Sequence, residues 1–546
     1  MWHVIIDRMS NVSRISIGAA LLIYLVLATA GLRYGLPDQD HFFSYSCDET
    51  TWIIGLSRIV PEKGMWNPYP FFHEPPGYLW IYGAGVLAAD SWGYLTPDLK
   101  RPAEEARRDV YARLHLIGRY IQVVLGTLAL LVLAVLAWEL FGPLCAVLAT
   151  AMLAVTPAFV AASTLSTDNI PVMLISLLSL GFLMRDGQQE QSGKRRLFAA
   201  AGLAGAAVAT KYSAAPLIVP LVYRAWKRPD RLQTVAQCLA LALVCFVMVC
   251  PFSVLTPRSY WSGAQVIAGA LVSSIQGAAQ RLLFPFEYPL HFSLGLPYLI
   301  LGVLAVVRFL RTREEALRCL LLWVGGLVLC AYGVGEKASP SRLLILAPAV
   351  VLLISVMASR ELVHKKMARR YMAGGILFVT WGLTLGLAVM IVNLRTSLPL
   401  QKQASLWLLS TVPPHSTIGL PRMPYFWTPD ILNSPNARGD LPQEPFRVTD
   451  LEFSITKARG VDYLVISSEE CHSGKRQTEM EDFCRWVEEG KDFVLIKTFE
   501  RDLSWGPWTW HRPANPLGMS DDDLWMSPLK VYMRSASVKP RPPAVT

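Results

Sequence analysis

The chain has 546 residues, of which 53% are hydrophobic and 17% are charged. Its mean hydropathy is +0.36, which means more apolar surface than one soluble core can bury, so we expect an integral, multi-pass membrane protein. The formal net charge of +10 lies largely in short basic connections that membrane orientation explains, so no nucleic-acid partner is expected.

Apolar stretches long enough to cross about 30 Å of hydrocarbon recur up to Arg395. We predict spans near residues 15–33, 116–138, 143–163, 169–184, 233–256, 293–309, 316–334, 342–359 and 371–394. The stretch 197–223 has a basic connection at each end, which requires an even number of crossings. We therefore predict two short helices that meet near Lys211, and about eleven spans in all.

Lys and Arg are concentrated in four short connections. These connections are residues 185–196, 224–231, 308–318 and 360–370. Cytoplasmic loops collect basic residues, so all four are expected in the cytoplasm. The first loop, residues 33–113, and everything after Arg395 then face the outside, together with the polar segments around Asp168 and Lys211. Ionisable groups at membrane depth are costly, so their convergence on one face predicts a functional site.

The sequence changes character near Arg395. Residues 1–395 are expected to form the transmembrane domain, and residues 396–546 a small extracytoplasmic α/β domain. In the latter, "DYLVISS" and "FVLIKTF" are typical of buried strands, and "TEMEDFCRWVEEG" of an amphipathic helix that ends at a glycine. An oxidising compartment permits a disulfide between Cys471 and Cys484, but the sequence leaves this pairing open.

The first loop contains the segment "SYSCDETTW". We predict a short helix along the membrane surface, with Asp48 and Glu49 in its first turn. Two interpretations remain open for the motif alone, a helix cap and a catalytic acid. Further along, "FFHEPPGYLW" places His73 and Glu74 before two prolines that stiffen the entry to a second apolar stretch.

Three more polar segments fall at predicted outer span ends. They are "STDN" with Asp168, "ATKYS" with Lys211 and Tyr212, and "GEKASPSRLLILAPAV" with Lys337 and Arg342. Asp168 is equally consistent with a helix cap. Lys337 and Arg342 are also consistent with interfacial residues whose charged ends reach water.

In order and spacing, six segments resemble the membrane glycosyltransferases of the GT-C class. They are "DET", "HEPPGYLW", "RYIQVVLGTLALL", "TPAFVAASTLSTDNIPVMLISLLSL", "AGLAGAAVATKYSAAPLIVPL" and "SRLLILAPAV". They are most similar to family 39, the branch with the protein O-mannosyltransferases and the lipid A aminoarabinose transferases. The resemblance implies inverting transfer of a sugar from a polyprenyl phosphate carrier to a lipid, protein or glycan acceptor. It also implies a bacterial inner membrane, with the active site facing the periplasm.

The resemblance also implies roles for individual residues. Asp48 is the expected base that takes the proton of the acceptor hydroxyl, with Glu49 as its neighbour and substitute, and Asp168 orients donor or acceptor. The residues expected to bind the carrier phosphate and sugar are His73, Glu74, Arg119, Lys211, Tyr212, Lys337 and Arg342. Positive charge is needed where the leaving phosphate develops negative charge. Arg119 is expected to pair with a loop carboxylate.

No cofactor is predicted, because the nine cysteines show no zinc spacing. Whether a divalent metal assists the phosphate is left open. Two other classes are considered, a polytopic transporter and a lipid-carrier flippase or scaffold. A transporter should place polar groups near the bilayer midplane, and a scaffold does not need acids and bases that converge from separate loops.

Overall fold

The computed structural model describes most of the chain. The described residues are 10–38, 44, 47–59, 74–97, 103–186, 194–258, 260, 262–263, 265, 293–334, 343–421, 428–429, 446–467, 477–501, 503–505, 508–510 and 528–535. They divide into two compact units. The helical unit comprises Met1–Leu32, Thr51–Trp92 and Leu116–Val392, and the mixed unit comprises Arg33–Thr50, Gly93–His115 and Asn393–Thr546.

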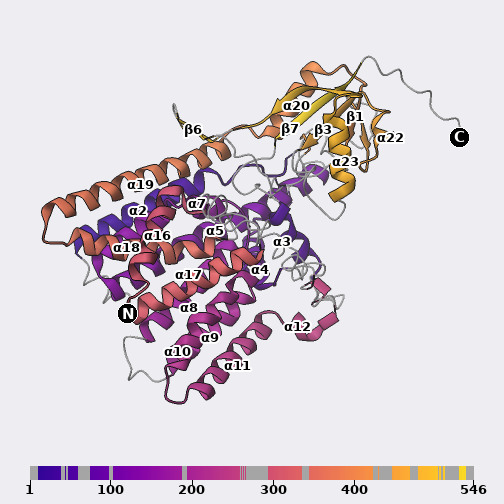
Figure 1. The fold of residues 1–546 in the computed structure, drawn as a ribbon. Helices are drawn as coiled ribbons and strands as arrows, with labels where there is room; N and C mark the ends of the chain where they lie inside the picture. Colours follow the sequence, from indigo (N-terminus) through magenta and orange to yellow (C-terminus); the bar gives the residue numbers. More distant parts are fainter. Residues whose placement is uncertain are drawn as a thin grey trace. The chain divides into compact units, whose positions relative to one another are not determined.

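The helical unit is built from apolar helices and two 3₁₀ segments (Figure 1). They are α2 (Asn11–Ala30), most of α3 (Cys47–Ser57), α4 (Gly77–Ser91), most of α5 (Ala103–Phe141), α6 (Pro143–Ala154), α7 (Pro157–Ser163), α8 (Asn169–Asp186), α9 (Arg195–Val208), η4 (Tyr212–Leu217), α10 (Ile218–Trp226), α11 (Arg231–Val249), α12 (Phe252–Leu255), α16 (Leu296–Phe309), α17 (Glu315–Val334), η6 (Leu344–Leu346), α18 (Ala347–Leu362) and α19 (Met367–Thr396). The boundaries between the units fall after Leu32, inside α3, after Trp92, inside α5 and near the end of α19.

Several of these helices have the length and apolar composition of membrane spans. Within the described residues, six helices are long and apolar enough to cross a membrane, or seven if the bent pair α6 and α7 forms one span. These two helices meet at 61°, because Pro157 begins α7 and cannot continue the hydrogen bonding of α6. The chain therefore has a helical membrane-type fold, while the count of about eleven spans stays a prediction.

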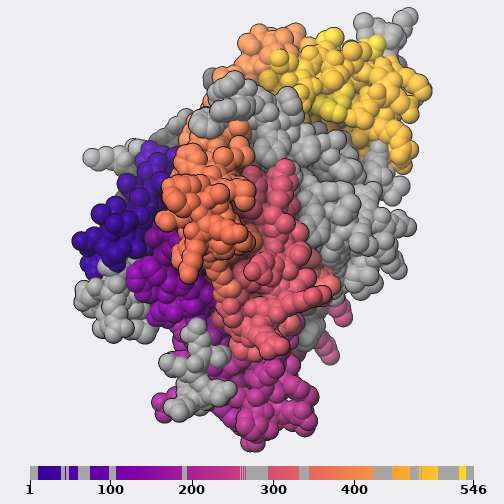
Figure 2. Space-filling view, turned by 60° about the vertical axis from the view of Figure 1, so that its left-hand side comes forward, coloured from indigo at the N-terminus to yellow at the C-terminus, as the bar shows by residue number. Residues whose placement is uncertain are grey.

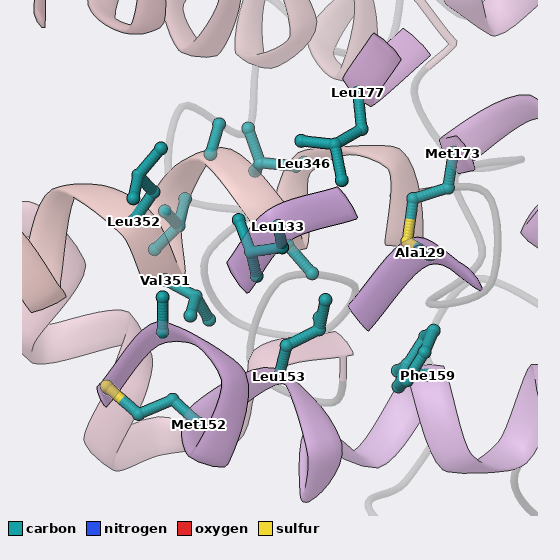
Figure 3. Packing of buried hydrophobic residues seen from close by; sticks show 14 of the residues in the cluster. Ala129, Leu133, Met152, Leu153, Phe159, Met173, Leu177, Leu346, Val351 and Leu352 are labelled. Atoms are coloured by element: carbon teal, nitrogen blue, oxygen red, sulfur yellow. The ribbon is translucent and has the colours of Figure 1, made fainter. Parts of the chain in front are cut away.

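Four helices meet in the apolar core of the helical unit. Figure 3 shows Leu133 of α5, Leu153 of α6, Leu177 of α8 and Val351 of α18 pointing toward one another, and each is at most 1% exposed. Ala129 of α5, also fully buried, leaves room for close helix approach, as small residues do in membrane bundles.

The outer surface of the helical unit is apolar as well. Figure 2 shows α2 in indigo and α19 in orange on one face. Val12 and Ile15 of α2 and Phe378 of α19 are each more than 70% exposed. Large apolar side chains in contact with solvent are disfavoured in a soluble protein, so this surface is suited to lipid.

Ion pairs bring the four basic connections together at one end of the helical unit. Arg224 pairs with Asp186 at 3.2 Å and with Glu315 at 3.0 Å, which links the first three connections. Arg360 pairs with Glu314 at 2.7 Å and adds the fourth. Their charge alone predicted that these connections lie on one side of the membrane. Their ion pairs place them at the same end of the helical unit.

The segment 197–223 forms α9, the 3₁₀ segment η4 and α10, with Lys211 at the N-terminal cap of η4. Its two helices run back and forth, since both of their outer ends lie in the basic connections. α9 packs between α8 and α11, as Figure 1 shows. Two short helices that meet near Lys211 are therefore present, as the flanking charges predicted.

Among its described residues, the mixed unit contains a five-stranded sheet and a separate two-stranded sheet, β5 with β6 (Figure 1). Its elements after α19 are α20 (Leu400–Thr411), β1 (Thr417–Leu420), β2 (Arg447–Asp450), α22 (Ile455–Ala458), β3 (Tyr463–Ser467), α23 (Gln477–Glu488), β4 (Phe493–Phe499), β5 (Leu503–Trp505), β6 (Trp508–Trp510) and β7 (Leu529–Arg534). The order of the larger sheet is β2-β1-β3-β7-β4. β1 is parallel to β2 and β3, and β7 is antiparallel to β3 and β4.

Both faces of the larger sheet are covered, and successive side chains of a strand point to opposite faces. Val465 of β3 packs with the core residues of α20, whereas Leu464 and Ile466 pack with Phe483 of α23. Cys484 of α23 is disulfide-bonded. Cys471 lies outside the described residues, so its pairing with Cys484 stays a prediction.

Candidate active site

The first turn of α3 belongs to the mixed unit and carries both loop acids. Asp48 is exposed, whereas Glu49 is fully buried. The Ser44 hydroxyl donates a hydrogen bond to Glu49 Oε2, and the Tyr111 phenol of α5 lies beside Thr50 and within electrostatic range of Glu49. Successive residues of an α-helix point about 100° apart, so the two acids cannot share one environment.

The rest of α3 lies in the helical unit, where Trp52 is buried. Its ring meets the edge of Tyr78 in α4, with ring centroids 5.0 Å apart. The Tyr78 hydroxyl is 2.8 Å from Ser166 Oγ, just before α8. A Cβ at Gly118 would come within 2.0 Å of Ser166 Oγ, so only glycine leaves room for this contact.

Asp168 and Lys211 form a buried ion pair in the helical unit. Asp168 precedes α8 and its side chain is 2% exposed, while the Lys211 side chain is 13% exposed. Lys211 Nζ also donates to Asn169 Oδ1 at 2.9 Å. The two predicted site residues are thus brought together, and each satisfies much of the other's charge.

The N-terminus of α4 approaches the turn that precedes Lys211. Gly77 N–H donates to the Ala209 carbonyl at 2.9 Å, and a Cβ at Gly77 would lie 2.4 Å from Thr210 Oγ1. The glycine of "HEPPG" is therefore needed for close backbone approach. Glu74 precedes this helix and is within electrostatic range of Tyr212, whose hydroxyl donates to Tyr260 at 2.7 Å.

The other predicted ligands divide into described and undescribed residues. Arg119 of α5 is 1% exposed and donates to the Leu32 carbonyl after α2 at 2.6 Å. Its pairing with a loop carboxylate stays a prediction. His73, Lys337 and Arg342 lie outside the described residues.

Sequence reasoning did not single out Ser44, Ser166, Asn169 or Gln122. Gln122 is fully buried, and its side-chain amide donates to the Thr167 carbonyl at 2.6 Å. An amide inside the apolar run "RYIQVVLGTLALL" was a usable signal, because polar groups in spans are costly. Ser44 and Ser166 gave none, since serine is common in loops.

α8 separates two charged groups in the helical unit. Asp168 precedes its first residue, and Asp186 ends it among the arginines of the basic connections. Eighteen residues of helix span about 27 Å, close to the thickness of hydrocarbon. The Asp168–Lys211 pair and the basic connections therefore lie at opposite ends of this helix.

Each unit has groups with chemistry of its own: the mixed unit carries the Asp48 and Glu49 carboxylates, a group type that can transfer protons, and the helical unit carries the Lys211 ammonium and the Arg119 guanidinium, group types that can bind an anion. Within the part of the chain that the structure describes, no group of three or more His, Cys, Asp or Glu residues is arranged to hold a metal ion.

Residues 115–255 match the family model described as dolichyl-phosphate-mannose-protein mannosyltransferase. The matched segment runs through α5 to α12, and so includes Arg119, Asp168, Lys211 and Tyr212. This match confirms the resemblance to GT-C glycosyltransferases that the sequence motifs suggested. No curated protein sequence matches the chain.

The structure is also similar to solved GT-C enzymes. The oligosaccharyltransferase of Archaeoglobus fulgidus is 14% identical over 84% of this chain and 69% of its own, with a TM-score of 0.46. ArnT of Cupriavidus metallidurans bound to undecaprenyl phosphate is 15% identical over 96% and 98%, with a TM-score of 0.47. The mycobacterial arabinofuranosyltransferase AftD is 15% identical over 96% and 40%, with a TM-score of 0.44.

Proposed function

We propose that this protein is a membrane glycosyltransferase that moves a sugar from a polyprenyl phosphate carrier to an acceptor outside the cytoplasm. The observation that carries the proposal is the buried Asp168–Lys211 pair. It lies at the end of α8 opposite the four basic connections, within the segment that matches the mannosyltransferase family model. A buried charged pair there needs a function, because such pairs add little stability.

The reaction begins when the Asp48 carboxylate takes the proton of the acceptor hydroxyl. The hydroxyl oxygen forms a bond to the anomeric carbon as the bond from that carbon to the carrier phosphate breaks. Attack from the face opposite the phosphate inverts the anomeric configuration, and the electron pair of the broken bond leaves with the phosphate. Asp48 suits the role of base, because it is exposed at the first turn of α3.

The leaving phosphate needs fixed positive charge. Lys211, Lys337 and Arg342 supply it, with the planar guanidinium of Arg342 suited to two-point contact. Lys211 already pairs with Asp168, so it shares its charge between that carboxylate and the phosphate. His73, Glu74, Arg119 and Tyr212 complete the binding site for the sugar and the carrier.

The basic connections are assigned to the cytoplasm by the positive-inside rule. Residues 33–113 and 396–546 are then extracytoplasmic, with residues 396–546 as an α/β domain and residues 1–395 as the transmembrane domain. We assign the protein to a bacterial inner membrane, with its active site on the periplasmic side. The donor carries a hexose or a pentose, and the acceptor is a lipid, a protein or a glycan.

Two measurements test the proposal. Cells that lack the protein should accumulate one polyprenyl phosphate sugar, identified by mass spectrometry, and the purified protein should consume that lipid and form a glycosidic bond. Asp48→Asn should lower kcat by roughly 100-fold or more, whereas Asp90→Asn, at an exposed acid of α4, should have no effect. Movement of the carrier lipid across the membrane without a new glycosidic bond would instead identify a transporter or flippase.

A further inference from the structure

The two adjacent acids of α3 occupy different environments. Asp48 is exposed, and Glu49 is 0% exposed with Ser44, also 0% exposed, donating to its Oε2. A base must meet an acceptor that arrives from outside the protein. A carboxylate that is enclosed and bonded to a buried hydroxyl cannot do so without breaking that bond.

The surroundings of Glu49 include the Tyr111 phenol of α5. Thr50 is 4% exposed and lies beside the Tyr111 phenol. Tyr111 is fixed in turn by His115, whose ring lies edge-on at 4.9 Å and whose Nδ1 is 3.0 Å from the Tyr111 carbonyl oxygen. These residues all belong to the mixed unit. The turn that carries Asp48 therefore has a hydrogen-bonded acid on its buried side, and its Thr50 lies beside the Tyr111 phenol of α5.

We propose that Glu49 is a positioning residue and not a second base: with Ser44 it fixes the rotation of α3 so that Asp48 faces the acceptor. This rests on the proposed function. A hydrogen bond between two buried side chains is costly to break, because each group is left without a partner when the bond is lost, which suits a contact that sets the direction of one helical turn. Because Glu49 and Asp48 are about 100° apart around the helix, burial of the first presents the second.

The proposal separates Glu49→Gln from Glu49→Ala. A glutamine amide oxygen still accepts a hydrogen bond from Ser44 but cannot serve as a base. Glu49→Gln should therefore retain kcat within roughly 10-fold of wild type, while Glu49→Ala and Ser44→Ala should each lower it by roughly 10- to 100-fold. The KM for the donor should not change, since neither residue is assigned to the carrier site.

The experiment measures kcat and KM of the purified full-length protein with the polyprenyl phosphate sugar that it consumes. Hydrogen exchange over residues 47–57 reports the order of α3, and it should rise in Ser44→Ala and stay low in Glu49→Gln. Ser57→Ala is the matched control, because Ser57 is exposed on the same helix and its hydroxyl donates within that helix to the Ile54 carbonyl at 2.8 Å. It should change neither readout.

Each outcome decides one question. If Glu49→Gln is as inactive as Asp48→Asn, Glu49 takes part in proton transfer and the positioning role is wrong. If Ser44→Ala keeps the wild-type kcat and wild-type hydrogen exchange, the Ser44 contact does not position the helix. The positioning role is then wrong as well. If wild type forms no glycosidic bond with any polyprenyl phosphate sugar, the proposed function itself fails.

Discussion

Replacing Lys211 with Met tests the buried ion pair most directly. Asp168 is 2% exposed and Lys211 13% exposed at the side chain, so Lys211→Met takes from an enclosed carboxylate the ammonium group that pairs with it. Removal of one partner of a buried pair costs roughly 3–5 kcal/mol of the free energy of unfolding. Asp168→Asn should cost less, about 1–3 kcal/mol, because the flexible lysine stem can carry the remaining ammonium toward water.

The double variant Asp168→Asn with Lys211→Met completes a thermodynamic cycle. It removes both charges, so it should be more stable than Lys211→Met alone, which gives a large coupling energy between the two sites. The assay is reversible unfolding of the purified protein in mixed detergent micelles. Lys365→Met is the matched control at an exposed position. If Lys211→Met stays within about 1 kcal/mol of wild type, the range expected of an exposed pair, then the charges of this pair are not enclosed as described.

Three further predictions concern other parts of the chain. Arg224→Met should destabilise the helical unit by roughly 1–3 kcal/mol in the same unfolding assay, because Asp186, fully buried at its side chain, loses one of its two arginine partners and keeps Arg228. Burial, with Glu488 nearby, raises the pKa of Tyr532 from 10.0 to about 12. Its stabilising contribution is therefore complete below pH 10 and lost as the pH rises toward 12, and Tyr532→Phe should remove one phenol of that pKa from the absorbance titration. Single cysteines at Ala338 and Ser473 should be labelled by impermeant reagents from the same, extracytoplasmic side, and labelling of Ala338 only from the cytoplasm would overturn the predicted topology.

Hydropathy and charge were enough to predict most of the helices, because burial in lipid is a local property of the sequence. The predicted hairpin at Lys211 followed from basic residues at both ends of one apolar stretch. The bend between α6 and α7 did not follow, although Pro157 marks its place. Apolar composition runs unbroken through residues 143–163, so a length criterion treats them as one span.

Contacts between distant segments were beyond the sequence. Asp168 and Lys211 are 43 residues apart, and each was interpreted alone, one as a cap or orienting acid and the other as a phosphate ligand. No periodicity within either segment indicates that they form a pair. The different burial of Asp48 and Glu49 was also hidden, since it depends on Ser44 and on Tyr111 of α5. Patterns within a single sequence predict which face of a helix or of the membrane a residue lies on, but not which residue it contacts.

The charges at the two ends of α8 lead to different functional conclusions. At one end, Arg224 and Arg228 enclose Asp186, and Glu315 adds a second acid to Arg224. Each acid at this end is already paired with an arginine. Replacing one of these residues should therefore affect folding. At the other end Asp168 offsets the single charge of Lys211. In the proposed reaction, the negative charge of the carrier phosphate is therefore not balanced by that pair alone, and stabilising the transition state needs further cations.

The cations that the sequence offers for this purpose are Lys337 and Arg342, in the segment before η6. Of the two, Arg342 has the guanidinium that can bind two phosphate oxygens at once. Because Lys211 is also paired with the buried Asp168, whereas Arg342 is assigned to the phosphate alone, variants of the two residues should differ in stability. Arg342→Ala should weaken donor binding by roughly 10-fold to over 100-fold with normal unfolding, whereas Lys211→Met should lose stability first. Normal donor binding by Arg342→Ala, at full stability, would place the phosphate elsewhere.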